Sequence, residues 1–452
     1  MKLSRKSRFL HLTPSRILVV GFALIILLGT FLLMLPISNA DGEPLPFVDA
    51  LFTATSATCV TGLVVVDTGT HFTVFGQVVL MLLIQVGGLG FMTMATLFAL
   101  AFKKRISLKE RLILQEALNQ GSMEGIVRLI RKVLLFAFCI EGTAAILFAT
   151  RWAFDLPLGQ AVYFGIFHAV SLFNNAGFDL FGSVSGPFSS LTSYVGDPVI
   201  NTVAMLLIVL GGIGFIVLSD VVDYRRTRKL SLHTKIVLTM TGLLIVIGTV
   251  VIFIFEFTNT RTLAGLSGWE QFWASLFQSV SPRTAGANTI DIGAMRQASQ
   301  FFMIVLMFIG ASPGSTGGGI KTTTFAILVG AVITMIRGKE DIVIYRYRLA
   351  KDRIFKAVTL TLLALFLVIM VSMILSMTED HPFLMILFET TSAFGTVGLT
   401  MGLTTDLTDV GKVLLCLTMF AGRLGPITLA YALGPKSERE LYRHPEGKIT
   451  IG

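Results

Sequence analysis

Charged residues are scarce in this chain. Only 14% of its 452 residues are Asp, Glu, Lys or Arg, whereas a soluble protein carries about a quarter. The hydrophobic share is 54%, and apolar runs such as 17–35 and 357–375 recur along the chain. Each of these runs is long enough to cross a hydrocarbon core of about 30 Å as a helix. The scarcity of charge therefore argues against a soluble protein and predicts an integral membrane protein.

Cysteine is also rare, and the three thiols, Cys59, Cys139 and Cys416, lie far apart in the sequence. Their spacing fits neither a disulfide framework nor a metal site. The sequence has no His-Glu-x-x-His motif and no convincing nucleophile–base arrangement. The glycine-rich stretch before Lys321 lacks the spacing of a Walker-type phosphate loop. These absences argue against an enzyme, against a covalently bound cofactor and against direct use of ATP.

The net charge of +9 is distributed unevenly. When the predicted segments are assigned alternately to the two sides, with 1–16 inside, most of the 36 Lys and Arg residues fall on the inner side. More than half of the 27 acidic residues fall on or near the outer side, where they raise the local concentration of cations. This positive-inside asymmetry predicts that both termini are cytoplasmic, and it explains the basicity without a nucleic-acid partner.

A repeat of about 110 residues underlies the hydropathy pattern. Each copy has a hexapeptide with phenylalanine second and serine last, and a short polar stretch that ends in glycine. The hexapeptides are 51–56, 166–171, 276–281 and 387–392, and the glycines are Gly62, Gly177, Gly286 and Gly398. Further glycines follow at Gly87, Gly211, Gly310 and Gly422. Two landmarks that recur in register four times indicate four units of one architecture.

Each unit is predicted to contain a spanning helix, a short helix, a glycine-bearing loop and a second spanning helix. The spanning helices are expected at 15–36 and 73–102, 126–151 and 198–222, 235–257 and 298–337, and 353–377 and 410–434. The short helices, near 46–57, 159–172, 269–280 and 383–393, cannot cross a membrane. A loop at membrane depth is tolerated only where it lines water or protein, so four loops predict one path on a common axis.

The predicted fold is therefore an all-α integral membrane protein. It has four tandem helix–pore-loop–helix repeats, with eight transmembrane helices and four pore helices around a central pore. The repeats are expected at 1–105, 106–230, 231–345 (with a broken second helix) and 346–434, and 435–452 is expected to be a cytoplasmic tail.

The loops suit a large monovalent cation. Glycine lets the backbone turn its carbonyl oxygens inward, and the C-terminal end of each short helix adds partial negative charge. Rings of carbonyls replace the hydration shell of potassium, whereas a divalent ion favours carboxylates, which these loops lack. The alternative is that the four loops only brace the helices. The residues expected to form the filter are Thr58, Cys59, Val60, Thr61, Gly62, Asn174, Asn175, Ala176, Gly177, Arg283, Thr284, Ala285, Gly286, Gly395, Thr396, Val397 and Gly398.

The second apolar run of the third unit is interrupted by a glycine-rich stretch. Its residues are Gly310, Ala311, Ser312, Pro313, Gly314, Ser315, Thr316, Gly317, Gly318, Gly319, Ile320 and Lys321. So many glycines and a proline cannot sustain a helix, and a broken helix at membrane depth should face a cavity. We predict a flexible gate below the loops, with Lys321 as an electrostatic contributor. The alternative is a cytoplasmic loop between two separate helices.

Arg423 lies near the middle of an apolar helix. Burial of a charge there costs about 2.5–3.5 kcal/mol, so an intramembrane arginine is expected to have a function. A positive charge below the loops would slow the passage of cations and keep it switchable. The alternative is a structural pairing of Arg423 with Glu389 or with a backbone carbonyl.

Other polar residues in apolar segments receive simpler interpretations. His168 is interpreted as a packed residue, and Glu141 likewise, because no partner for a proton relay is evident. Glu389 is expected to brace its loop. The side chains of Asn174 and Asn175 either add oxygens near the second loop or support its backbone.

The segment Thr396-Val397-Gly398-Leu399 resembles the potassium-channel filter sequence Thr-Val-Gly-Tyr. With the stretches 57–63, 173–178, 282–286 and 394–399, it makes the chain similar to the Trk/Ktr/HKT superfamily of potassium transporters, and in particular to bacterial Ktr membrane subunits. The resemblance covers nearly the whole chain. It implies that the four loop glycines mark the selective site, that the stretch from Gly310 is an intramembrane loop obstructing the path, and that Arg423 faces the pore. Gly62 favours potassium, because some relatives that favour sodium carry serine there.

The resemblance also implies the physiological role. It predicts uptake of K⁺ across the bacterial plasma membrane, with Na⁺ as a candidate activator, and a homodimer in which each protomer has its own pore. It predicts a cytosolic ring of regulatory subunits that binds adenine nucleotides. The basic segments 103–132 and 337–356 and the tail from Pro435 are candidate docking sites, and lipids surround the rest.

Two alternatives stay open. A sodium-coupled symporter of another class would show an inverted repeat, whereas these repeats run in parallel. A less selective monovalent cation channel would fit the differences among the four loops. Neither needs ATP, because inward movement of one positive charge gains about 2.3 kcal/mol per 100 mV of membrane potential.

Overall fold

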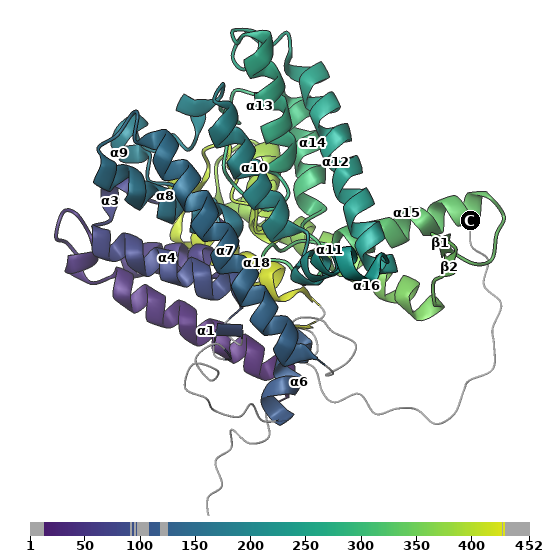
Figure 1. Cartoon of the computed structure of the whole chain (residues 1–452). Coiled ribbons are helices and arrows are strands. Elements are labelled where there is room, and N and C mark those ends of the chain that lie inside the picture. The colour runs from purple at the N-terminus through teal and green to yellow at the C-terminus, as the bar shows by residue number, and fades with distance from the viewer. Residues whose placement is uncertain are drawn as a thin grey trace, which may run out of the picture.

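The structure is a computed structural model that describes residues 13–90, 93, 94, 96, 108–117, 125–426, 428 and 429. Figure 1 shows an almost entirely helical molecule, with the first unit (purple) on one side and the third unit (green) on the other. The predicted tail at 435–452 and part of the basic segment 103–132 lie outside the described residues.

The first helix of each unit is long and apolar. These helices are α1 (Pro14–Leu33), α7 (Ile126–Trp152), α12 (Leu232–Glu256) and α16 (Lys351–Thr378). Within the described ranges, they are the four single helices with the length and composition to cross a membrane. Thr13 and Ser231 cap α1 and α12 by accepting a backbone N–H, as N-cap residues do. The bounds of these four long helices agree closely with the prediction.

Four shorter helices precede the loop glycines, close to the predicted positions. They are α2 (Phe47–Cys59), α8 (Leu158–Phe173), α13 (Gly268–Val280) and α17 (Phe383–Gly395). Proline is the N-cap residue of α2, α8 and α17, whereas a capping box between Ser267 and Glu270 starts α13. The helices α2 and α17 end because the next residue, Val60 or Thr396, adopts a left-handed conformation.

The second helix of each unit is shorter than predicted. These helices are α4 (Val74–Leu89), α10 (Pro198–Gly212), α14 (Gln297–Phe308) and α18 (Asp409–Leu424). The prediction of uninterrupted helices at 73–102, 198–222 and 410–434 was wrong. Gly90, Gly214 and Gly425 have φ of 83°, 95° and 85°, which no right-handed helix accommodates.

In the first, second and fourth units the breaks fall at equivalent positions, three residues after Gly87, Gly211 and Gly422. In the second unit the chain turns by 101° between α10 and α11 (Phe215–Thr227). In the third unit the break widens into the segment 309–321, which precedes α15 (Thr322–Ile336). The interrupted helix of the third unit is therefore the extreme form of a feature that all four units share.

The four units close into a ring. The second helix of each unit packs on the short helix of the next, since α4 contacts α8, α10 contacts α13, and α14 contacts α17. The last unit repeats the pattern with the first, because α18 contacts α2. The same contact at each step means that the units run in parallel around one axis, which an inverted repeat would not produce.

Smaller elements connect the units. They are η2 (Pro36–Ser38), α3 (Thr68–His71), α6 (Leu108–Ala117), α9 (Gly182–Ser185), η3 (Thr192–Tyr194), η4 (Thr404–Asp406), β1 (Val343–Ile344) and β2 (Tyr347–Arg348). The two strands form an antiparallel hairpin, with Val343 opposite Arg348 and Ile344 opposite Tyr347. In Figure 1 this hairpin lies beside α15.

His168 of α8 packs among aromatic rings, as expected of a structural residue. Trp152 and Phe181 lie 5.1 and 4.8 Å from its ring centroid. Its Nδ1 lies 2.7 Å from the Phe164 carbonyl oxygen, and its Nε2 accepts the Leu180 N–H at 3.3 Å. Nδ1 thus bonds its own helix, and Nε2 holds Leu180, which follows the second loop.

Candidate ion-binding site

The four loop glycines meet around one axis. A Cβ built on each glycine would lie within 2.7 Å of a carbonyl oxygen of the next loop. In every case that oxygen belongs to the residue just before the next glycine. The pairs are Gly62 with Ala176, Gly177 with Ala285, Gly286 with Val397, and Gly398 with Thr61. The contacts run head to tail and return to the first loop, so the loops form a closed ring.

Backbone conformation alternates along each loop. The residue two positions before each glycine has a positive φ although it is not glycine, and the glycine itself also has a positive φ. The values are 59° for Val60, 58° for Asn175, 76° for Thr284 and 50° for Thr396, and they are 94°, 69°, 76° and 91° for the glycines in chain order. The residue between them is not among those with positive φ. Alternation in the sign of φ turns successive carbonyl groups to the same side of the chain, so each loop can present a column of oxygens.

This conformation is strained, because a left-handed residue other than glycine costs roughly 1–2 kcal/mol. The same strain at the same position in all four loops points to a geometric demand rather than to accident. The C-terminal ends of the four short helices point at the same ring, and their partial negative charge favours a cation there.

A buried serine braces each loop, and the sequence analysis missed this role. The serine is the last residue of each hexapeptide. In the first and fourth units its hydroxyl accepts the N–H of the loop glycine at 3.0 Å. In the second and third units it donates to the carbonyl of the residue after the glycine. The serines are Ser56, Ser171, Ser281 and Ser392.

Replacement of Ser392 by alanine is expected to destabilise the fourth loop. The buried Gly398 N–H would lose its acceptor, which costs about 1–3 kcal/mol. We expect the midpoint of thermal unfolding, measured in detergent, to fall. Ser376→Ala is the matched control, because the exposed Ser376 hydroxyl bonds only its own helix. Equal midpoints for the two variants would contradict the bracing role.

The side chains near the ring divide into two groups. Arg283 points away from the axis, and its guanidinium donates to the Thr241 carbonyl and hydroxyl of α12, both at 3.2 Å. The Asn175 side chain shares a hydrogen bond with the Thr284 hydroxyl at 3.1 Å, which supports the loop backbone. In contrast, the buried hydroxyls of Thr58 and Thr61 have no hydrogen-bond partner in the described part of the chain.

The segment 309–321 lies against the loops. The Gly318 N–H donates to the Thr396 hydroxyl at 2.9 Å, and the Thr316 N–H donates to the Gly211 carbonyl at 3.2 Å. Most of the segment is buried. It is therefore part of the molecular interior, and the interpretation as a cytoplasmic loop between separate helices was wrong.

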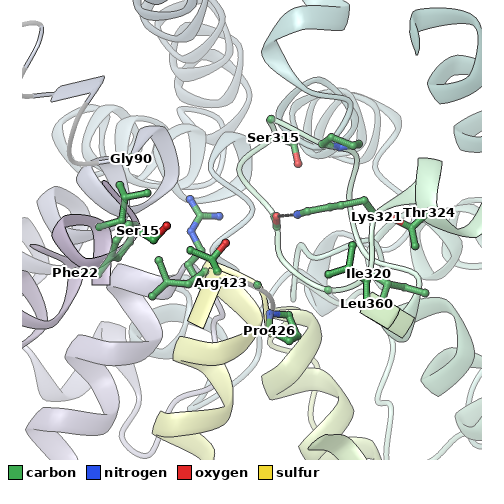
Figure 2. Close-up of a pocket in the computed structure, with 18 of the residues that line it drawn as sticks. Ser15, Phe22, Gly90, Ser315, Ile320, Lys321, Thr324, Leu360, Arg423 and Pro426 are labelled. Carbon is green, nitrogen blue, oxygen red and sulfur yellow. Dashed lines mark hydrogen bonds between the residues drawn. The ribbon is translucent and has the colours of Figure 1, made fainter. Parts of the chain in front are cut away.

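Lys321 and Arg423 hold this segment from two sides (Figure 2). The Lys321 Nζ donates to the Gly317 carbonyl of its own segment at 2.7 Å. The Arg423 guanidinium donates to the Thr316 carbonyl of the segment and to the Gly88 carbonyl of α4, the latter at 3.0 Å. One side chain of the fourth unit thus joins the third unit to the first.

Arg423 does not pair with Glu389. Glu389 accepts the hydroxyls of Thr400 and Thr404, which follow the fourth loop, and the bond from Thr400 is 2.8 Å long. Of the two structural alternatives for Arg423, pairing with carbonyls is therefore correct. Glu389 was expected to brace its loop, and its bonds instead hold the chain just beyond that loop.

A cavity of about 590 Å³ lies next to the segment 309–321. Two of the residues at which the second helices break, Gly90 and Gly425, line it. Lys321, Lys356 and Arg423 also line it, and no acidic residue does so within the described ranges. Figure 2 shows Lys321 and Arg423 on opposite sides of this space. The positive charge opposes the entry of a cation into the cavity.

A family model of cation transport proteins, TrkH, matches residues 5–439. The chain belongs to the TrkH family of cation transport proteins. It is therefore a transport protein and not an enzyme, and its long apolar helices are those of a multi-pass membrane protein. The predicted resemblance to Trk and Ktr proteins is confirmed.

Three relatives illustrate the range of the TrkH family. The chain is 47% identical to "Ktr system potassium uptake protein B" of Bacillus subtilis over 98% of both chains. It is 40% identical to the protein of the same name from Vibrio alginolyticus, over 97% of this chain and 94% of that protein. It is also 40% identical to "Potassium/sodium uptake protein NtpJ" of Enterococcus hirae over the full length of both.

A solved structure supports the fold of this TrkH-family chain. The potassium transporter TrkH from Vibrio parahaemolyticus superimposes with a TM-score of 0.72, over 96% of this chain and 87% of that one. The sequence identity is 18%, so the likeness concerns the fold alone. It agrees with the all-α architecture predicted from the repeats.

Proposed function

We propose that this chain is the ion-translocating subunit of a Ktr-type potassium uptake system in the bacterial plasma membrane. The closed ring of four loops is the observation that carries the proposal. Each loop contributes neutral carbonyl oxygens near its glycine, and Arg283, the one charged residue among the predicted filter residues, points away. Neutral oxygens suit a monovalent ion that must bind and leave again.

The names of the relatives favour potassium as the substrate. Two of the relatives described above are potassium uptake proteins by name, and the third is a potassium/sodium uptake protein. Sodium is therefore a candidate activator or second substrate. A less selective monovalent cation channel is the second candidate function, because the four loops differ in sequence and their ring is not strictly symmetric.

The segment 310–319 is proposed as the gate. It is glycine-rich, it bonds to Thr396 of the fourth loop, and it lines the cavity beside Lys321. Arg423 would hold the gate closed through its bond to the Thr316 carbonyl, and both basic side chains would repel an ion at the same place. Opening would require the segment to leave the ring and release Arg423.

The proposed assembly follows the Ktr relatives. It is a homodimer in which each protomer has its own pore, with both termini in the cytoplasm, and it carries a cytosolic ring of regulatory subunits that bind adenine nucleotides. The basic stretch 337–356 is a candidate contact for the ring. The exposed apolar side chains of the first helices, such as Leu24, Leu28 and Phe31, would contact lipid.

Growth of a bacterial strain that lacks its own potassium uptake systems tests the proposal. The chain, expressed with a regulatory partner, is expected to restore growth at limiting K⁺, and the test is run with and without Na⁺. Radioactive rubidium uptake by the purified chain in liposomes gives the matching direct measurement. Equal fluxes of Na⁺ and Rb⁺ would favour the less selective channel. Flux that requires a fixed ratio of Na⁺ to Rb⁺ would favour a symporter, and no flux with folded protein would contradict transport.

A further inference from the structure

Three polar side chains form a buried hydrogen-bonded triangle behind the second loop. They belong to Gln85 of α4, Glu141 of α7 and Asn174, which directly follows α8. The Gln85 Nε2 donates to Glu141 Oε2 at 3.1 Å. The Asn174 Nδ2 donates to Glu141 Oε1 at 3.0 Å and to Gln85 Oε1 at 2.9 Å. Glu141, interpreted from the sequence as a packing residue, therefore has two hydrogen-bond partners that the sequence did not reveal.

The triangle is isolated from water. Asn174 is completely buried, and Glu141 and Gln85 are 5% and 8% exposed. Both Glu141 oxygens accept a hydrogen bond, one from Gln85 and the other from Asn174. An ionisable group inside an apolar helix is expensive, so packing alone would be served better by an apolar side chain. This free-energy cost indicates that Glu141 has a role in positioning the residues to which it is hydrogen-bonded.

The triangle holds a loop that belongs to the ring. Asn174 lies three residues before Gly177, and its Nδ2 also donates to the Val170 carbonyl at 2.9 Å. Its side chain packs against Gly88, where an added Cβ would strike it. The Gly88 carbonyl in turn accepts from Arg423. One turn of α4 therefore contacts both Asn174, which supports the second loop, and Arg423, which contacts the proposed gate.

Glu141 does not reach the ring itself, because Asn174 lies between the carboxylate and the loop backbone. Any effect of Glu141 on an ion must pass through the position of Asn174 or through the field of its charge. Side chains that orient the ligands of a metal typically change affinity or activity by about 10- to 100-fold when they are removed. The same logic applies to carbonyl ligands that a hydrogen bond keeps in place.

We propose that Glu141 is a positioning residue for ion selectivity. Its carboxylate, through Asn174 and Gln85, fixes the second loop so that the Ala176 carbonyl and Gly177 stay in the ring. The inference rests on the proposed function of the ring as a potassium filter. In it, Glu141 sets the position of the second of the four filter loops.

The test compares Glu141→Ala and Glu141→Gln with wild type in liposomes. Rubidium and sodium uptake are measured separately, with the KM for rubidium and the rubidium-to-sodium flux ratio as readouts. Glu141→Ala is expected to lower the flux ratio by about tenfold. The flux ratio of Glu141→Gln is expected to fall between those of wild type and Glu141→Ala. Its amide keeps one acceptor oxygen but places an NH2 group opposite a neighbouring donor. Glu256→Gln is the matched control, since Glu256 is also buried but bonds Asn259 and Thr262 outside the loops. It is expected to keep the wild-type ratio.

A double variant separates positioning from folding. Glu141→Gln with Gln85→Glu exchanges the amide and the carboxylate, so the two side chains again form a donor–acceptor pair and both still accept from Asn174. We expect it to recover a flux ratio closer to wild type than Glu141→Gln alone, which a loss of stability would not produce. A wild-type ratio and KM in folded Glu141→Ala would overturn the inference, and so would a double variant no better than the single one. Absence of rubidium uptake by the wild-type chain in the presence of its regulatory partner would instead refute the proposed function.

Discussion

Replacement of Gly398 by alanine is expected to abolish selective potassium uptake. The added Cβ would strike the Thr61 carbonyl oxygen, which belongs to the first loop. Gly398 also has a φ of 91°, a conformation that alanine rarely adopts. The two loops would have to separate, so the oxygens of Thr61 and Val397 would leave the positions at which they can replace water around the ion. We expect rubidium uptake to fall by at least about tenfold, as for other changes that displace ligands.

Gly42→Ala is the control for the backbone effect alone. Gly42 has a φ of 74°, but nothing lies within 4 Å of an added Cβ. The two variants share the conformational penalty of roughly 1 kcal/mol, and only one of them crowds the ring. Rubidium uptake and the sodium-to-rubidium flux ratio are measured for both at matched amounts of folded protein. Similar uptake by the two variants would show that the contact with Thr61 does not matter for transport.

Removal of the Arg423 guanidinium is expected to raise potassium flux when no regulatory subunit is present. The side chain bonds the Thr316 carbonyl of the proposed gate and the Gly88 carbonyl of α4, and both bonds would be lost in Arg423→Ala. The charge itself also opposes a cation, since a unit charge 8 Å away costs about 2 kcal/mol at an effective dielectric constant of 20. Together these effects predict an increase of roughly tenfold or more in the basal flux.

Lys356→Ala separates the two contributions of Arg423. Lys356 lines the same cavity and carries the same charge. No hydrogen bond from its side chain to the segment 309–321 is found within the described part of the chain. Its removal should therefore raise basal flux less than Arg423→Ala does. Rubidium efflux from loaded liposomes without regulatory subunits measures both variants. Unchanged or lower flux in Arg423→Ala would contradict a role in closing the gate.

The prediction of the short helices and of the loop glycines rested on local sequence patterns. A hexapeptide with the same residues at its second and last positions recurs four times, and each copy ends before a glycine. Such periodicity needs no knowledge of distant contacts. The helix breaks were missed because glycines in an apolar run, such as Gly90 or Gly214, also occur in straight membrane helices that pack closely. Their positive φ becomes visible only in three dimensions.

The partners of polar side chains could not be predicted in the same way. Glu141 bonds residues 56 and 33 positions away, and Arg283 bonds Thr241, which lies 42 positions away on another helix. A sequence shows that a carboxylate lies in an apolar helix, but it does not show which neighbour will satisfy it. The bracing serines were visible in the repeat, yet their hydroxyls could as well have bonded their own helices, as many serines do.

The contact between α18 and α2 has a consequence for biosynthesis. The first quarter of the ring emerges from the ribosome early, but the neighbour that completes it is encoded almost at the end of the message. Until α17 and α18 have been inserted, Gly62 and Thr61 lack the loop that borders them in the finished molecule. A prematurely terminated chain that lacks α17 and α18 therefore cannot close the ring of four loops.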